Sequence, residues 1–144
     1  MRIGLYSETA REAVIAARTV IAENCFTNDS NGIRRFRTEA PQFMNKHTYD
    51  RLCRLGDYFS MSECRDLLFH VQEHRFTLPQ LKDALDTLGL DFKGFYLKDS
   101  VLDEYRKTYP ADQTLTNLDN WQNFEKAHPD TFIEMYRFWC IKTK

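Results

Sequence analysis

The chain has 144 residues, 42% of them hydrophobic and 28% charged, which excludes a disordered polar segment and fits one globular domain. Its formal net charge is −1, so no overall charge directs it to nucleic acid or to anionic lipid. The four cysteines lack metal-type spacing, and neither a signal peptide nor a long apolar run occurs. We therefore expect a reduced, cytoplasmic protein that binds neither nucleic acid nor membrane.

The first element is an apolar run, Ile3 to Tyr6, that reads as a strand leading into a helix. Ser7 is expected to cap that helix, which the apolar spacing extends to about residue 24. A strand followed by a long helix is half of a β-α-β unit, so the pattern favours an α/β fold. The given residues before this strand are too few to form a hairpin with it, so we expect it to pair with a later strand or with a segment outside these 144 residues.

A helical insertion is predicted for residues 33–69, after the turn-rich run from Asn28 to Gly32. Its first helix is expected to be interrupted at Pro41, and Ser60 with Glu63 forms a capping box for its last helix. Arg34 and Arg35 lie on the polar side of the first helix. They either recognise a phosphate or carboxylate or form a solvated helix face.

The clearest helix of the sequence runs from Leu78 to Leu88. Thr77 and Gln80 form a capping box, and Gly89 provides a left-handed ending. A strand is predicted from Asp91 to Leu97, with Phe92 and Phe95 on opposite faces by strict alternation.

Two more helices, ending at Pro110 and at His128, precede a last strand from Tyr136 to Lys142. About three strands and seven helices are therefore expected. We interpret residues 1–144 as one domain that carries the 33–69 insertion.

The densest group of polar side chains lies just before the central helix, at His70, Gln72, Glu73, His74 and Arg75. Two histidines four residues apart can bind a metal on a helix, but this stretch reads as extended, so no metal site is expected. Glu73 and His74 could act as a general base and the group that orients it. The alternative is a hydrogen-bonded network that ties the insertion to the sheet.

Four segments carry a resemblance to a known family: IGLYSE (3–8), GIRR (32–35), CRDLLFHVQEHRFTLPQ (64–80) and DTFIEMYRFW (130–139). Together they resemble the C-terminal part of a bacterial methyltransferase family that is often fused to tetratricopeptide repeats. The resemblance implies a class I fold dependent on S-adenosylmethionine, whose seven strands have the order 3-2-1-4-5-7-6 with the last antiparallel. Residues 3–6, 91–97 and 137–141 would then be strands five, six and seven.

The resemblance also implies what this chain lacks, since the family binds its cofactor with a glycine-rich turn that is missing here. We therefore expect a half-sheet without cofactor of its own, the acceptor-substrate and lid half of a methyltransferase acting on a small molecule or a protein. The alternative is a non-catalytic module that forms homo-oligomers through its first strand. The expected catalytic residues are His70, Glu73 and His74, and the expected substrate-binding residues are Ser7, Gln72, Arg75, Arg34 and Arg35.

Overall fold

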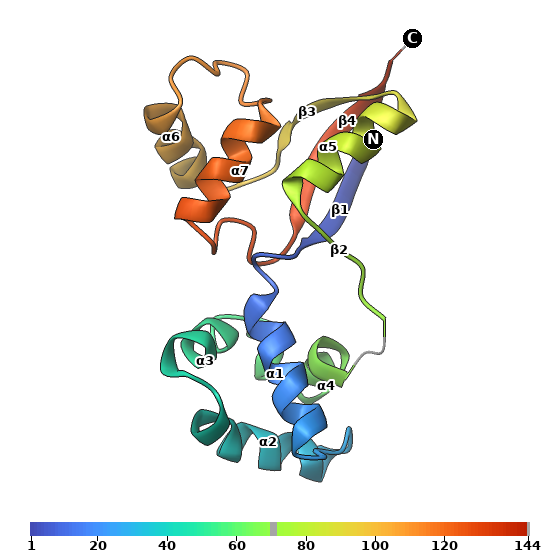
Figure 1. Ribbon diagram of the computed structural model, residues 1–144, viewed down its shortest axis with the longest axis vertical. Coiled ribbons are helices and arrows are strands. Elements are labelled where there is room, and N and C mark those ends of the chain that lie inside the picture. Colours follow the sequence, from blue (N-terminus) through green and yellow to red (C-terminus); the bar gives the residue numbers. More distant parts are fainter. Residues whose placement is uncertain (70–71, 144) are drawn as a thin grey trace. The chain divides into compact units, whose positions relative to one another are not determined.

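The computed structural model describes residues 1–69 and 72–143. They form two compact units, a sheet unit of Met1–Ala10 and His74–Lys144 and a helical unit of Arg11–Glu73 (Figure 1). Seven α-helices and four strands occur in the described part of the chain, so the fold class is α/β, as predicted.

The sheet is mixed and open, with the strand order β2-β1-β4-β3. The strands are β1 (Arg2–Ser7), β2 (Arg75–Phe76), β3 (Leu90–Phe95) and β4 (Tyr136–Lys142). The last strand, β4, lies antiparallel between β1 and β3, whereas β2 pairs with β1 in parallel. Three strands were expected. The fourth, β2, has only two residues, too few to show the alternation of apolar and polar side chains by which a strand is predicted.

The strand β4 alternates as its sequence predicts. Tyr136, Phe138 and Cys140 are fully buried, whereas Trp139 and Ile141 are half exposed on the opposite face. One face of the sheet therefore carries the core of this unit.

The strand β3 does not alternate as predicted, because it contains a bulge. The pairing with β4 shifts between Phe92, which lies opposite Cys140, and Gly94, which lies opposite Trp139. Gly94 has φ of 119°, in the region that favours glycine. The extra residue turns Phe92 and Phe95 to the same face, where their ring centroids are 4.9 Å apart. The prediction of opposite faces was therefore wrong.

Three helices accompany the sheet: α5 (Leu78–Leu88), α6 (Asp99–Thr108) and α7 (Leu118–Ala127). Both bonds of the predicted capping box at Thr77 and Gln80 are present, and Gly89 ends α5 with φ of 62°. The apolar stripe of α5 packs with side chains from α6, α7, β3 and β4 in one core centred on aromatic residues. These are Phe95, Tyr105, Trp121, Phe124, Phe132, Tyr136 and Phe138.

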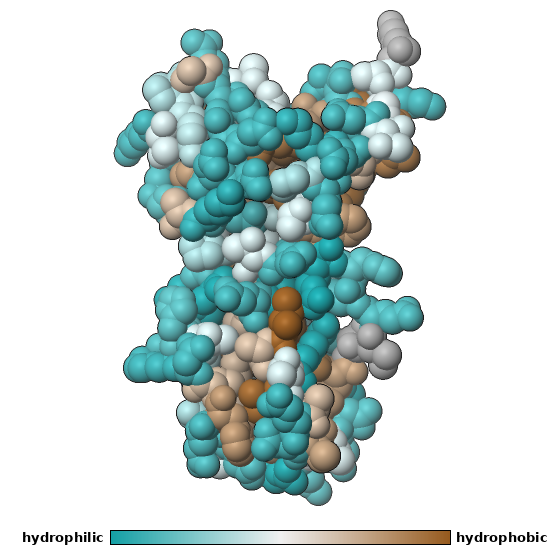
Figure 2. Space-filling view, in the orientation of Figure 1, coloured by the Kyte–Doolittle hydropathy of each residue, from teal (hydrophilic) through white to brown (hydrophobic). Residues whose placement is uncertain are grey.

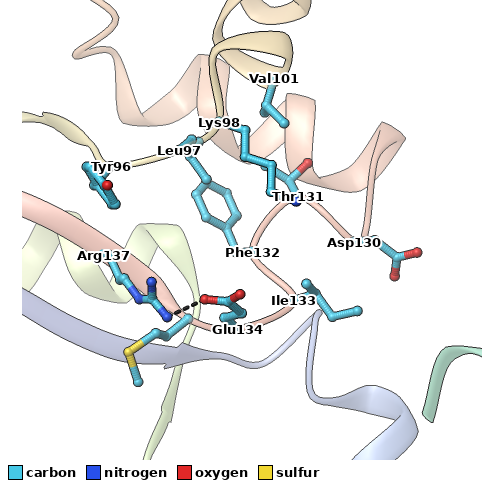
Figure 3. A pocket seen from close by; sticks show the side chains of 11 residues that line it. Tyr96, Leu97, Lys98, Val101, Asp130, Thr131, Phe132, Ile133, Glu134 and Arg137 are labelled. Atoms are coloured by element: carbon cyan, nitrogen blue, oxygen red, sulfur yellow. Dashed lines mark hydrogen bonds and ion pairs between the residues drawn. The ribbon is translucent and has the colours of Figure 1, made fainter. Parts of the chain in front are cut away.

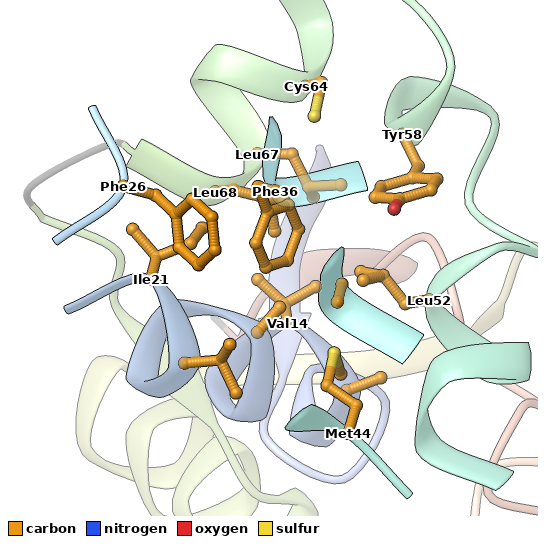
Figure 4. Packing of buried hydrophobic residues seen from close by; sticks show 14 of the residues in the cluster. Val14, Ile21, Phe26, Phe36, Met44, Leu52, Tyr58, Cys64, Leu67 and Leu68 are labelled. Atoms are coloured by element: carbon orange, nitrogen blue, oxygen red, sulfur yellow. The ribbon is translucent and has the colours of Figure 1, made fainter. Parts of the chain in front are cut away.

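The helical unit contains α1 (Glu12–Glu23), α2 (Ser30–Phe43), α3 (Lys46–Leu52), a 3₁₀ turn (Gly56–Tyr58) and α4 (Met61–Phe69). Side chains from all of these elements share a second core, in which Val14, Phe36 and Leu52 converge (Figure 4). This unit therefore begins at Arg11 and includes α1, whereas the sequence placed α1 with the sheet and the insertion at 33–69. The physical reason is that the small apolar face of α1 packs on the other helices.

Two local expectations in the helical unit need correction. Pro41 lies inside the last turn of α2, which continues to Phe43, so the proline does not divide the helix. The helix α1 begins only at Glu12, and no side chain caps it, so Ser7 is not its cap.

The visible surface of the molecule is mainly hydrophilic, with scattered apolar patches (Figure 2). None of the helices among the described residues is both long and apolar enough to cross a membrane.

Candidate functional site

Glu73, expected to be a general base, is held in the helical unit by two arginines. Its carboxylate lies 3.7 Å from Arg11 Nε and 3.2 Å from an Arg18 terminal nitrogen, and its side chain is 7% exposed. Arg18 also donates to the carbonyl oxygen of Leu67, at 2.7 Å and 3.2 Å. Glu73 therefore joins the end of the helical unit to Arg11 and to α1, and these contacts do not tie the insertion to the sheet.

The remaining residues of that predicted cluster are not gathered into a site. His74 and Gln72 are exposed, and Arg75 is half-buried in β2, where it lies opposite Tyr6. His70 lies outside the described residues. The structure therefore provides no pairing of Glu73 with His74 as base and orienting group.

The two predicted arginines of α2 differ in their surroundings. Arg35 donates to the Asn24 carbonyl oxygen at 3.2 Å, lies 3.4 Å from Glu39 and stacks over the Phe26 ring. Arg34 is exposed. Arg35 is therefore used within the helical unit, although its side chain remains 53% exposed.

Ser7, predicted to bind substrate, is buried at the carboxyl end of β1 in a polar network. Its Oγ donates to Glu125 Oε1 at 2.5 Å and accepts from the Ala10 backbone N–H at 3.0 Å. The Tyr136 hydroxyl donates to the same carboxylate, 2.8 Å from Oε2 and 2.9 Å from Oε1. Three elements, β1, α7 and β4, are thus joined through one carboxylate.

Burial controls the chemistry of this network. It raises the pKa of the Glu125 carboxyl, although the hydrogen bonds from Ser7 and Tyr136 oppose the shift. Burial, with the adjacent Glu125 charge, also raises the pKa of the Tyr136 hydroxyl. Glu125 is 4% exposed and Ser7 is 1% exposed, so solvent does not reach the pair. This arrangement ties the two central strands to α7 and does not present a reactive group to a ligand.

Glu125 was not among the residues predicted from the sequence, although a signal for it existed. It follows Trp121 by four residues and Leu118 by seven, so it lies on the buried stripe of α7. An ionisable residue on an apolar helical stripe indicates a buried hydrogen-bonded group.

A hollow of the sheet unit lies where the chain leaves β3 and enters β4. Its volume is about 430 Å³, and its walls come from residues 96–98, Val101 of α6, residues 130–135 and Arg137. Figure 3 shows the Phe132 ring and the Ile133 side chain among these walls, with the Glu134 carboxylate directed at Arg137. None of the described residues that were predicted to act on or bind substrate lines it.

The structure offers no metal centre within residues 1–69 and 72–143, since no group of three or more His, Cys, Asp or Glu side chains could hold an ion. Comparison with known protein families and with curated proteins found no match for this chain.

Proposed function

We propose that this chain is the acceptor-substrate and lid half of a class I methyltransferase dependent on S-adenosylmethionine. The observation that supports it is the strand order β1-β4-β3 with β4 antiparallel to both neighbours. The resemblance implies this same order and direction for strands five, seven and six. The helix α5 directly before β3 agrees with the helix expected before the sixth strand.

In this proposal the residues before α5 have different roles. The exposed His74 is the candidate proton acceptor for the methyl-accepting group, and His70 stays a candidate on sequence grounds. Glu73 is a positioning residue, since two arginines already engage its carboxylate. The cofactor would be held by a glycine-rich half-sheet that the residues of this chain do not supply.

The test is methyl transfer by the chain as it occurs in its full-length protein. We expect label from S-adenosylmethionine to reach a small molecule or protein, and His74→Ala to slow transfer about 100-fold, as for loss of a general base. His47→Ala is the control, because His47 is an exposed histidine in α3 of the helical unit. Absence of transfer would overturn the proposal, and equal rates for both variants would overturn the role of His74.

A second candidate function, self-assembly, is favoured by the open edge of β1. Of its six residues only Tyr6 and Ser7 pair with β2. Met1 exchanges backbone hydrogen bonds with Cys140, so by antiparallel alternation the N–H groups of Arg2 and Gly4 point away from β4. Such an edge can accept a strand from a second copy.

Sedimentation of the chain over a range of concentrations tests this candidate. We expect a dimer that Arg2→Pro weakens by removing an outward N–H, whereas Arg2→Ala keeps that N–H and the dimer. A monomer at every concentration would rule out assembly through this edge.

A further inference from the structure

The hollow between the end of β3 and the start of β4, described above, contains one cation that no acidic side chain neutralises. Lys98 makes no hydrogen bond or ion pair through its ammonium group with any described residue. Arg137 is paired with Glu134, and Figure 3 shows the Asp130 carboxylate directed away from Lys98. The charge available to a ligand in this hollow is therefore a single positive one.

The rest of the lining is largely apolar and preformed. Phe132 is 1% exposed, and its ring packs against Phe95, Trp121 and Tyr136 in the core. The turn that carries it is fixed by the Thr131 hydroxyl, which donates to the His128 carbonyl oxygen at 2.6 Å. A preformed wall reduces the ordering cost of binding.

We propose that this hollow binds a small monoanionic ligand, a carboxylate with an apolar or aromatic body. Its volume of about 430 Å³ lies within the range of about 300–1,000 Å³ typical of small-molecule sites. The carboxylate pairs with Lys98, and the apolar body contacts Val101, Ile133 and Met135. Tyr96, 60% exposed, adds an aromatic side chain to the lining, and the Arg2 guanidinium lies 5.2 Å from the centroid of its ring. Binding at this site does not depend on methyl transfer.

Because the hollow offers, among its described residues, one unpaired cation, Lys98, it favours a ligand with one negative charge over more highly charged ligands. A phosphate monoester carries close to two negative charges at neutral pH, and phosphate sites supply several donors or cations for them. A neutral amide of the same shape fills the same space without the ion pair. The order of affinity is therefore carboxylate above amide, with a phosphate ester no better than the carboxylate.

The experiment is a titration of the ¹⁵N-labelled 144-residue chain with 4-phenylbutyrate and with 4-phenylbutyramide, followed by amide chemical shifts. We expect saturable shifts confined to residues 96–101 and 131–137, with about tenfold tighter binding of the carboxylate. In Lys98→Met this preference disappears while the amide still binds. Lys98 is exposed and its side chain does not cap α6, so the variant keeps its fold.

Lys107→Met is the matched control, since Lys107 is an exposed lysine in the last turn of the same helix. We expect it to keep the wild-type preference. Equal affinity for carboxylate and amide in the wild-type chain, equal loss of the preference in both variants, shifts centred elsewhere, or no saturable binding of either probe at millimolar concentration would each overturn the proposal. These outcomes are separate from the methyl-transfer assay, which uses neither probe.

Discussion

The Tyr136 hydroxyl donates to both carboxylate oxygens of Glu125, at 2.8 Å and 2.9 Å, and so joins β4 to α7 inside the core. Ser7 adds β1 to the same carboxylate. Two hydroxyl donors converge on one acceptor group that is 4% exposed.

We expect Glu125→Gln to destabilise the sheet unit by about 1–3 kcal/mol. The amide of glutamine offers one oxygen in place of two, so a buried hydroxyl donor loses its acceptor. Urea unfolding followed by tryptophan fluorescence measures the change, because Trp121 lies in this core. Glu104→Gln is the control: its carboxylate is half exposed, 3.8 Å from His128, and its loss is expected to cost less than about 1 kcal/mol. Equal effects of the two substitutions would contradict the role of the network.

The difference in stability between the wild-type chain and Glu125→Gln is expected to depend on pH. Burial raises the folded-state pKa of Glu125, so the folded chain holds this proton more tightly than the unfolded chain. The contribution of Glu125 to stability is therefore greatest below the unfolded value, about 4.3, and is lost as pH rises through the raised folded value. Urea unfolding at a series of pH values should show the wild-type advantage over Glu125→Gln shrinking with rising pH. An advantage that grows with pH would show that the hydrogen bonds outweigh burial.

Glu73→Gln is expected to destabilise the helical unit by about 2–3 kcal/mol. Removing the charge leaves Arg11 and Arg18 without their carboxylate, which costs about 3–5 kcal/mol in a fully buried pair. The effect is smaller here because the Arg18 side chain is 20% exposed. Hydrogen exchange of α1 and α4 amides measures the local loss. Glu63→Gln, an exposed glutamate of α4, is expected to leave exchange nearly unchanged.

Gly94→Ala is expected to destabilise the sheet by about 1–3 kcal/mol through backbone strain alone. Gly94 has φ of 119°, and no atom lies within 4 Å of an added Cβ. Gly56 has equally open space without that backbone conformation, so Gly56→Ala is expected to be neutral or slightly stabilising. Thermal unfolding of both variants separates the two cases. A neutral Gly94→Ala would mean that the bulge relaxes without cost.

No specific binding of S-adenosylmethionine or its demethylated product to the 144-residue chain is expected below millimolar concentration. The sheet of the described residues contains no glycine-rich turn to hold the cofactor, so too little surface remains to offset the entropy of association. Calorimetric titration checks this, and a saturable micromolar isotherm would contradict the proposed division of roles.

Both ends of α5 were predicted from the sequence, because the residues that define them, from the capping box at Thr77 to Gly89, are close together in the chain. Local signals could not predict β2, whose two residues become a strand only through pairing with Tyr6 and Ser7. The bulge in β3 was missed for a related reason, since strict alternation assumes an uninterrupted ladder.

The candidate sites also differ in how far the sequence predicts them. The many polar residues around Glu73 marked this stretch as a candidate site. Only the structure shows that the partners of Glu73 are Arg18 of α1 and Arg11, the residue before α1. The hollow beside Lys98 combines two segments that are far apart in the sequence, and neither has a distinctive composition. Such a site depends on tertiary packing, which periodicity does not describe.

The central position of β4 has a consequence for biosynthesis. During translation β1 and β3 are both made before β4, yet β4 is the neighbour that β1 and β3 share. The nascent chain therefore holds two apolar strands apart until residues 136–142 leave the exit tunnel. The helical unit, whose residues 11–73 are contiguous, can form its core during translation. Sheet closure is thus a step that waits for β4, and a ribosome stalled before Tyr136 would carry a folded helical unit and an unformed sheet.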